Sequence, residues 1–104
     1  HLNYMCKEFS ERLGSKIRKL TLRDTRSRWG SCSSDANLMF SWRLVMAPED
    51  VLAYVAAHEV AHLKHMNHSK DFWETVEYLF GPYKKERAWL KQNGSFLHRY
   101  KFES

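Results

Sequence analysis

The chain has 104 residues, 43% of them hydrophobic and 28% charged, which fits one globular domain and excludes a disordered chain. No apolar run approaches the roughly 20 residues that cross a bilayer, so we expect no transmembrane helix and no membrane partner. The net charge is +5, and the two cysteines, Cys6 and Cys32, are too few for a disulfide scaffold, which favours a reducing, cytoplasmic location.

The first quarter of the chain predicts a helix followed by a strand. Apolar residues recur at helical spacing from Leu2 to Leu13, and Gly14 suits the cap that ends such a helix. Cys6 belongs to this apolar stripe, which predicts a buried structural thiol. The strand is predicted over residues 17–26.

A β-hairpin is predicted next. Every second residue from Leu38 to Met46 is apolar, a period that indicates a strand with one buried face. Residues 33–37 are typical of a turn and join this strand to a shorter one over residues 29–32. We therefore expect a small antiparallel sheet.

Three helices are predicted in the second half. The first begins at Pro48 and runs to Leu63, the second covers about residues 70–80, and the third follows residues 81–82 and ends near residue 93. Because strands and helices are segregated along the chain, the predicted class is α+β, with the sheet packed against the first of these helices.

Residues 58–62 read His-Glu-Val-Ala-His within an otherwise apolar helix. His58 and His62 lie one turn apart on its most apolar face, where burying imidazoles and a carboxylate costs several kcal/mol unless something compensates. One Zn²⁺ ion compensates, because both rings can reach it. Glu59 points about 100° away from His58, the position of a general base acting on water. The alternative is two core histidines bonded to backbone carbonyls.

A hydrolytic zinc site needs a third protein ligand. His68 lies beyond the expected helix end, where Asn67 can adopt a left-handed conformation and turn the chain back. His65 would approach the ion along the same line as His62, so we expect it at the surface or supporting a ligand. The separations of four and six residues match the metzincin ligands, but this chain has His65 where that pattern has glycine, and it lacks the methionine turn.

The next predicted helix offers acidic alternatives. Glu74 or Glu77 would serve as a third ligand, and Asp71, Glu74 or Glu77 would hold a ligand ring by its second nitrogen. The alternative for all three is a solvated helix face. Phe72 and Trp73 are expected to pack this helix onto the one that carries the histidines.

Basic residues are concentrated between Arg12 and Arg28, where seven of them accompany a single acid, Asp24. Such an excess attracts phosphate or acidic partners, so nucleic acid is an alternative partner. No helix-turn-helix or stacking motif accompanies the charge, which favours a solvated pair of strands.

Several motifs together resemble one family. Residues 28–33, residues 37–44 and the run over residues 58–69 with Phe72 and Trp73 are similar to the YgjP-like metallopeptidase domain, a bacterial zincin family related to the WLM and SprT-like proteases. The similarity runs from about residue 23 to residue 94.

This resemblance implies a zincin-like fold with one zinc ion per chain, held by His58, His62 and His68, and Glu59 as catalytic base. Family members usually carry a further N-terminal β-rich region, so we expect residues 1–104 to be a single domain from which that region is missing.

In zincin folds a sheet edge above the metal pairs with an extended substrate, which makes the first strand of the hairpin a candidate binding edge. The candidate substrate-binding residues are Trp29, Gly30 and Ser31. The candidates for a second donor to the developing oxyanion are Tyr83, His98, Tyr100 and Arg43.

The predicted activity is zinc-dependent hydrolysis of peptide bonds in a polypeptide substrate, with a glutamate as general base. One alternative is a protease acting on DNA-associated proteins, or a nucleic-acid-binding module, using the basic residues from Arg12 to Arg28. Another is a zinc-binding interaction domain without activity. Glu59 argues against the latter, because a purely structural site has no use for a buried base.

Overall fold

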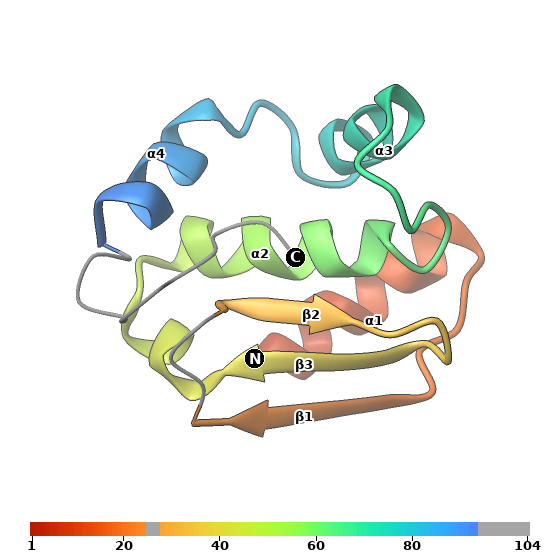
Figure 1. Ribbon diagram of the computed structural model, residues 1–104, viewed down its shortest axis with the longest axis horizontal. Coiled ribbons are helices and arrows are strands. Elements are labelled where there is room, and N and C mark those ends of the chain that lie inside the picture. Colours follow the sequence, from red (N-terminus) through yellow and green to blue (C-terminus); the bar gives the residue numbers. More distant parts are fainter. Residues whose placement is uncertain (25–27, 94–104) are drawn as a thin grey trace.

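The computed structural model describes residues 1–24 and 28–93, and these confirm the α+β class. In chain order the elements are α1 (Leu2–Leu13), β1 (Lys19–Arg23), β2 (Gly30–Cys32), β3 (Asn37–Ser41), the 3₁₀ helix η1 (Trp42–Met46), α2 (Glu49–Ala61), α3 (Lys70–Phe80) and α4 (Lys84–Asn93). Helix α2 lies between two layers, with the sheet and α1 on one side and α3 and α4 on the other (Figure 1).

The sheet has three strands in the order β1–β3–β2. Strands β2 and β3 form the predicted antiparallel hairpin, in which Gly30 pairs with Phe40. Strand β1 pairs with β3 in parallel, so the sheet is mixed rather than antiparallel. This register sets Leu20 beside Leu38 and Leu22 beside Phe40, so the four share one face of the sheet, on which Leu38 and Phe40 are buried and Leu22 is 51% exposed.

The second strand of the hairpin ends earlier than its alternating pattern predicts. Strand β3 stops at Ser41, and the next five residues form η1. The Ser41 hydroxyl accepts a hydrogen bond from the Arg43 backbone N–H at 3.3 Å, which caps this short helix. Within η1, Leu44 is buried and Met46 is 71% exposed, so the alternation of apolar residues there does not mark a buried face.

Helix α2 is apolar on all sides because it is covered on all sides. Ten of its 13 residues are buried, as expected for a helix between two layers. It begins after Pro48, and the carboxylates of Glu49 and Asp50 lie in its first turn, where they complement the positive end of the helix dipole. It ends at Ala61 rather than at Leu63, and a turn follows it.

Helix α1 ends at Gly14, whose φ of 69° is the left-handed conformation that the sequence predicted for this cap. Arg12 lies two residues earlier, in the last turn of α1, and donates hydrogen bonds of 3.0 Å to the carbonyls of Tyr78 and Leu79 at the end of α3. This basic side chain therefore joins two helices.

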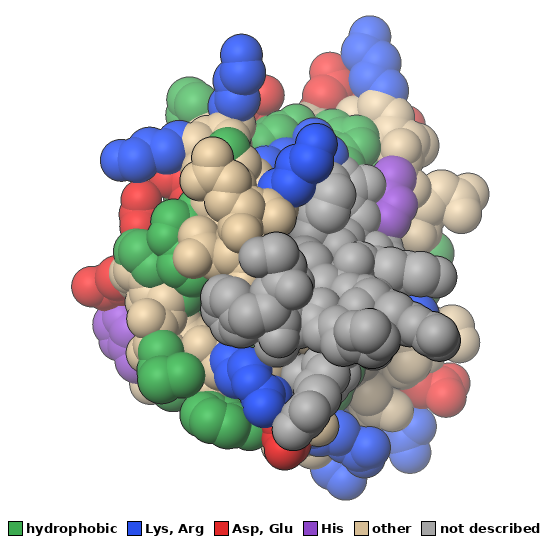
Figure 2. All heavy atoms as spheres, turned by 60° about the vertical axis from the view of Figure 1, so that its left-hand side comes forward, with side chains coloured by type: hydrophobic (Ala, Val, Ile, Leu, Met, Phe, Trp, Pro, Cys, Tyr) green, Lys and Arg blue, Asp and Glu red, His purple; other side chains and the backbone are tan. Residues whose placement is uncertain are grey.

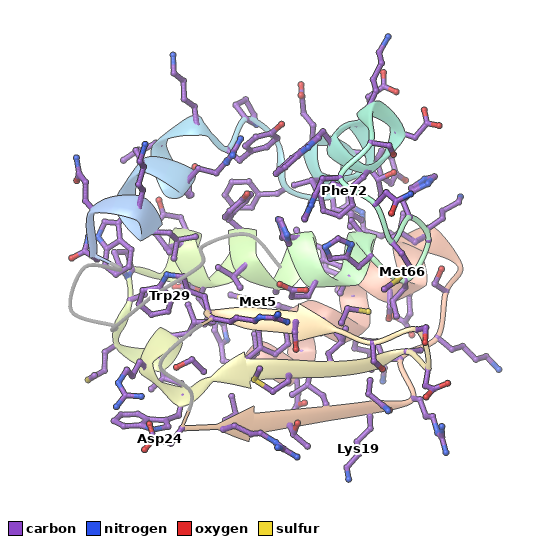
Figure 3. The ribbon with its side chains drawn as sticks, viewed as in Figure 1. Met5, Lys19, Asp24, Trp29, Met66 and Phe72 are labelled. Atoms are coloured by element: carbon purple, nitrogen blue, oxygen red, sulfur yellow. The ribbon has the colours of Figure 1, made fainter. Side chains whose placement is uncertain are left out.

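The other described basic residues of the predicted stretch are exposed, and Arg26 lies outside the described residues. Lys19 points away from the sheet (Figure 3), and Lys16, Arg18 and Arg23 are exposed. On the end of the molecule that carries α4 and η1, Figure 2 likewise shows basic side chains spread around the rim of the described residues. A nucleic-acid partner stays a prediction. In the described ranges, no helix has the length and apolar character needed to cross a membrane.

Candidate active site

Helix α2 carries two of the predicted ligands on the surface that faces α3. His58 and His62 are each 3% exposed. Phe72, in the first turn of α3, stacks on the His62 ring at a centroid distance of 4.4 Å and meets the His58 ring edge-on at 5.0 Å. Figure 3 shows Phe72 above the C-terminal half of α2. The prediction that Phe72 packs α3 onto α2 is confirmed.

His68 reaches the same place from the loop between α2 and α3. It precedes Ser69, whose hydroxyl accepts a hydrogen bond from the Phe72 backbone N–H at 3.2 Å and so fixes the start of α3. The ligand atoms of His58, His62 and His68 all lie within 4.8 Å of one another. Because His68 is exposed, the cluster has one side open to solvent.

The chain turns toward His68 in a different way from the one expected. Among the described residues only Ala36 combines a side chain with a positive φ, so Asn67 is not left-handed. Instead, residues 62–64 form a turn, and the His65 backbone N–H donates to the Ala61 carbonyl at 3.0 Å. The reversal therefore starts directly at the end of α2.

The chemistry of the cluster fits a divalent metal. The Nε2 atom of His58 is buried and has no hydrogen-bond partner in the described part of the chain, a costly arrangement unless a cation accepts its lone pair. The Nδ1 atom of His62 donates to the His65 carbonyl at 3.0 Å, which leaves Nε2 as the ligand atom of that ring. Burial, followed by the charges of His62, His68 and Arg87, lowers the pKa of His58 to about 2, so this ring is in the neutral form that binds metals.

Glu59 lies against β2, on another side of α2, and is 2% exposed. A Cβ atom on Gly30 would lie 3.1 Å from the Glu59 Cγ atom, 3.2 Å from its Oε2 atom and 3.2 Å from the Met39 carbonyl oxygen. The missing side chain at Gly30 therefore provides the space that the Glu59 carboxylate occupies. Burial, and then the Glu59 charge, raises the pKa of the Cys6 and Cys32 thiols to about 12.

The three candidate substrate-binding residues, one just before β2 and two within it, have different environments. The Trp29 side chain is 3% exposed and packs on Trp89 of α4 at a centroid distance of 6.2 Å, so it supports β2 rather than presenting its ring to a substrate. Ser31 pairs with Met39 and follows Gly30, so its side chain points to the outer face of the sheet. Gly30 is the member of the three that touches a site residue.

The predicted supporting residues on α3 lie on its exposed side. Asp71 and Glu74 are exposed and line a hollow together with Arg12 and His65. Glu77 is also exposed, and in the described part of the chain only the three histidines form a group able to hold a metal, so neither Glu74 nor Glu77 joins it. His65 supports His62, as expected, but through its backbone carbonyl rather than its ring.

Aromatic side chains form a wall beside the histidines, and one of them, Tyr54, was missed at the sequence level. Tyr54 lies one turn before His58, with its ring centroid 6.0 Å away, and Tyr83 stacks on Tyr54 at 5.5 Å. Trp73 stacks on His68 at 5.8 Å. The spacing of four residues between Tyr54 and His58 was a usable signal, whereas the approach of Tyr83 depends on how the helices pack.

Of the two candidate oxyanion donors that the structure describes, one lies near the histidines, against the aromatic wall. Tyr83 reaches the wall just described, whereas Arg43 pairs with Asp24, which Figure 3 places at the far end of the sheet from the histidines. His98 and Tyr100 lie outside the described residues.

The fold is α+β, three histidines converge at one place, and a buried glutamate lies beside the first of them on α2. This is the arrangement of a metallopeptidase. In agreement, the fold is similar to the crystal structure of the metallopeptidase zymogen of Pyrococcus abyssi abylysin, with a TM-score of 0.76 and 20% sequence identity over 96% of this chain and 98% of that chain. No curated protein matches the sequence.

The chain belongs to the YgjP-like family. The family model described as "YgjP-like, metallopeptidase domain" matches residues 1–93, which confirms the resemblance seen in the sequence motifs. The family and the fold together identify a metal-dependent peptidase.

Proposed function

We propose that this chain is a zinc-dependent peptidase that hydrolyses peptide bonds of a polypeptide, with Glu59 as the general base. The observation that carries the proposal is the convergence of three histidine ligand atoms within 4.8 Å, with the Nε2 atom of His58 buried and lacking a hydrogen-bond partner in the described residues. Three imidazole ligands suit zinc, and three protein ligands leave a fourth position for water.

His58, His62 and His68 would hold the ion. When bound, zinc supplies Lewis acidity that brings the pKa of water at the site toward about 7. The His65 carbonyl keeps the His62 ring in the tautomer that presents Nε2, and Phe72 shields this ring on one face.

Glu59 then takes the proton of the attacking water at its carboxylate and delivers it to the leaving amine. Its carboxylate is held at the edge of the sheet, beside Gly30 of strand β2. Because β2 is an edge strand next to α2, an extended substrate can add to it by main-chain hydrogen bonds, which brings the scissile bond alongside Glu59. Tyr83 is the group we assign to hold the developing oxyanion.

The decisive experiment compares the wild type with Glu59→Gln on an unfolded protein substrate, together with the zinc content of each. We expect about one zinc per chain in both and a rate lower by about 10²–10⁴-fold in the variant, because the general base is lost while the ligands remain. Equal rates in the two proteins would end the assignment of Glu59 as the base, whereas zinc binding without cleavage by the wild type would favour the interaction-domain alternative.

The ligand set has its own test in a matched pair of histidine variants. His68→Ala removes a ligand and should weaken zinc binding by at least about 100-fold. His65→Ala should keep zinc, because His65 contributes its backbone carbonyl to the site rather than its ring. Zinc affinity is measured by competition with a chromogenic chelator, and the opposite ranking would show that the wrong histidine was assigned.

A further inference from the structure

His68 differs from the other two histidines of the cluster in what holds its ring. His58 lies on α2 and His62 directly follows it, and both side chains are 3% exposed, so the helix and the packing around it restrict them. His68 lies in the loop before α3 and is exposed. A loop side chain that is open to solvent samples several rotamers unless a neighbour restricts it.

The His68 ring is contacted by other rings rather than by a hydrogen-bond partner. A histidine ligand usually has a partner on the nitrogen that does not bind the metal, and the His65 carbonyl has this role for His62. Within residues 1–24 and 28–93, the His68 ring takes part in no hydrogen bond. Its orientation in the described fold therefore depends on the rings around it.

Trp73 is the ring that lies nearly flat against His68. The two planes are 25° apart, and their centroids are 5.8 Å apart. Phe72 meets the His68 ring edge-on at 5.0 Å and so limits it along another direction. Stacking of planar rings at centroid distances of about 4.5–7 Å is favourable and depends on their orientation, so Trp73 can select one rotamer of His68.

Side chains from other parts of the fold hold Trp73 itself in place. The Tyr83 ring, just before α4, lies 5.3 Å from the Trp73 ring, and the Arg87 guanidinium of α4 lies over the Trp73 ring at 4.7 Å. On the side of α2, the His58 ring meets Trp73 edge-on at 5.6 Å. A ring that is packed by three elements is a firm support for a ligand that comes from a loop.

We propose that Trp73 is a positioning residue of the metal site, whose ring sets the orientation of His68 so that this loop ligand meets the two histidines of α2. This inference rests on the proposed function, because it assigns a role at the same site. The His68 ring centroid lies 4.9 Å from that of His62 and 5.4 Å from that of His58. Ligands that are held in place beforehand bind a metal more tightly, since less rotamer freedom is lost on binding.

Packing of α3 onto α2 does not by itself explain Trp73. Phe72 is fully buried and already fills the contact between these helices, whereas Trp73 is only half-buried and lies beside the exposed ligand. The two roles have different consequences. Loss of a packing residue lowers stability, whereas loss of a positioning residue lowers zinc affinity through His68.

The test measures zinc affinity by competition with a chromogenic chelator, so it does not depend on turnover. Trp73→Leu keeps an apolar side chain without the flat ring and should weaken zinc binding about tenfold. Trp73→Phe restores a ring and should stay within about threefold of the wild type. The matched control is Trp89→Leu, since Trp89 is also half-buried but packs on Trp29; it should change zinc affinity by less than about twofold.

A double-mutant cycle shows whether Trp73 acts through His68. In the His68→Ala background, Trp73→Leu should change zinc affinity by less than about twofold, because the ring that it orients is gone. Circular dichroism checks that each variant is folded. If Trp73→Leu is not folded, Trp73→Met takes its place with the same loss expected, because methionine fills irregular space without a flat face.

The outcomes against the proposal are distinct. Wild-type affinity in Trp73→Leu overturns it, and so does an equal loss in Trp89→Leu or in the His68→Ala background, since Trp73 would then act on the fold in general. Failure of the wild type to cleave any polypeptide would overturn the proposed function, while the zinc affinities would still decide the role of Trp73. A wild type that binds no zinc would overturn both.

Discussion

Replacement of Gly30 by alanine tests whether the space beside Glu59, the proposed general base, is needed. The added Cβ atom would lie 3.1 Å from the Glu59 Cγ atom, where ordinary contacts begin at 3.4 Å, so one neighbour must move by about 0.3 Å. The other close atom is the Met39 carbonyl oxygen in the paired strand, which can move only with the sheet. Positive φ among the described glycines is confined to Gly14 and Gly81, so the backbone at Gly30 accepts alanine and the substitution tests space alone.

We expect two measurable effects from Gly30→Ala. The added methyl group overpacks the site against Glu59, whose side chain is 2% exposed, and should cost about 1–3 kcal/mol of stability. Thermal or urea unfolding measures this loss. Displacement of the carboxylate should lower kcat/KM roughly tenfold, because a misplacement of about 1 Å can cost about 100-fold. Zinc content should be unchanged, since the histidines face α3 rather than β2.

The control is Thr21→Ala in β1, which changes a side chain of the same sheet away from the site. Its kcat/KM should equal that of the wild type. If Gly30→Ala instead keeps both the unfolding midpoint and kcat/KM of the wild type, the contact with Glu59 does not constrain the base, and the reasoning from this close approach is wrong.

Two further predictions follow from the shifted pKa values. Because the pKa of His58 is lowered from 6.5 to about 2 by burial and by neighbouring charges, only the unfolded state of the metal-free chain takes up this proton between those values. The free energy of unfolding of the metal-free chain should therefore fall below about pH 6.5, and His58 should contribute up to about 1.4 kcal/mol of this fall per pH unit. Urea unfolding at pH 7, 6 and 5 should show a shallower pH dependence for His58→Gln than for the wild type. The same pH dependence in both proteins would contradict the assignment. Burial and the charge of Glu59 raise the pKa of Cys6 and Cys32 to about 12. A disulfide reagent at pH 8 should therefore label neither thiol in the native chain and both thiols in urea. Rapid labelling of Cys32 in the native chain would show that its thiol does not have this raised pKa.

The sequence by itself determined most of the helices and the spacing of His58 and His62. Helical periodicity and caps are local properties, so α1, α3 and the Gly14 cap follow from residues a few positions apart. His58 and His62 are fixed relative to each other by one helical turn, and the apolar character of α2 already indicated that they are buried.

Only the tertiary structure decided which distant parts meet. The parallel pairing of β1 with β3 depends on contacts between separate segments, which a period of two along each strand does not specify. The place of Gly30 against Glu59 requires β2 to lie beside α2, and the support of His62 by the His65 carbonyl uses a backbone atom that no side-chain motif reveals. Arg87 comes close to the histidines because α4 folds back over α2. The positions of helices that are separated along the chain are set by the packing of buried surfaces and not by local preference.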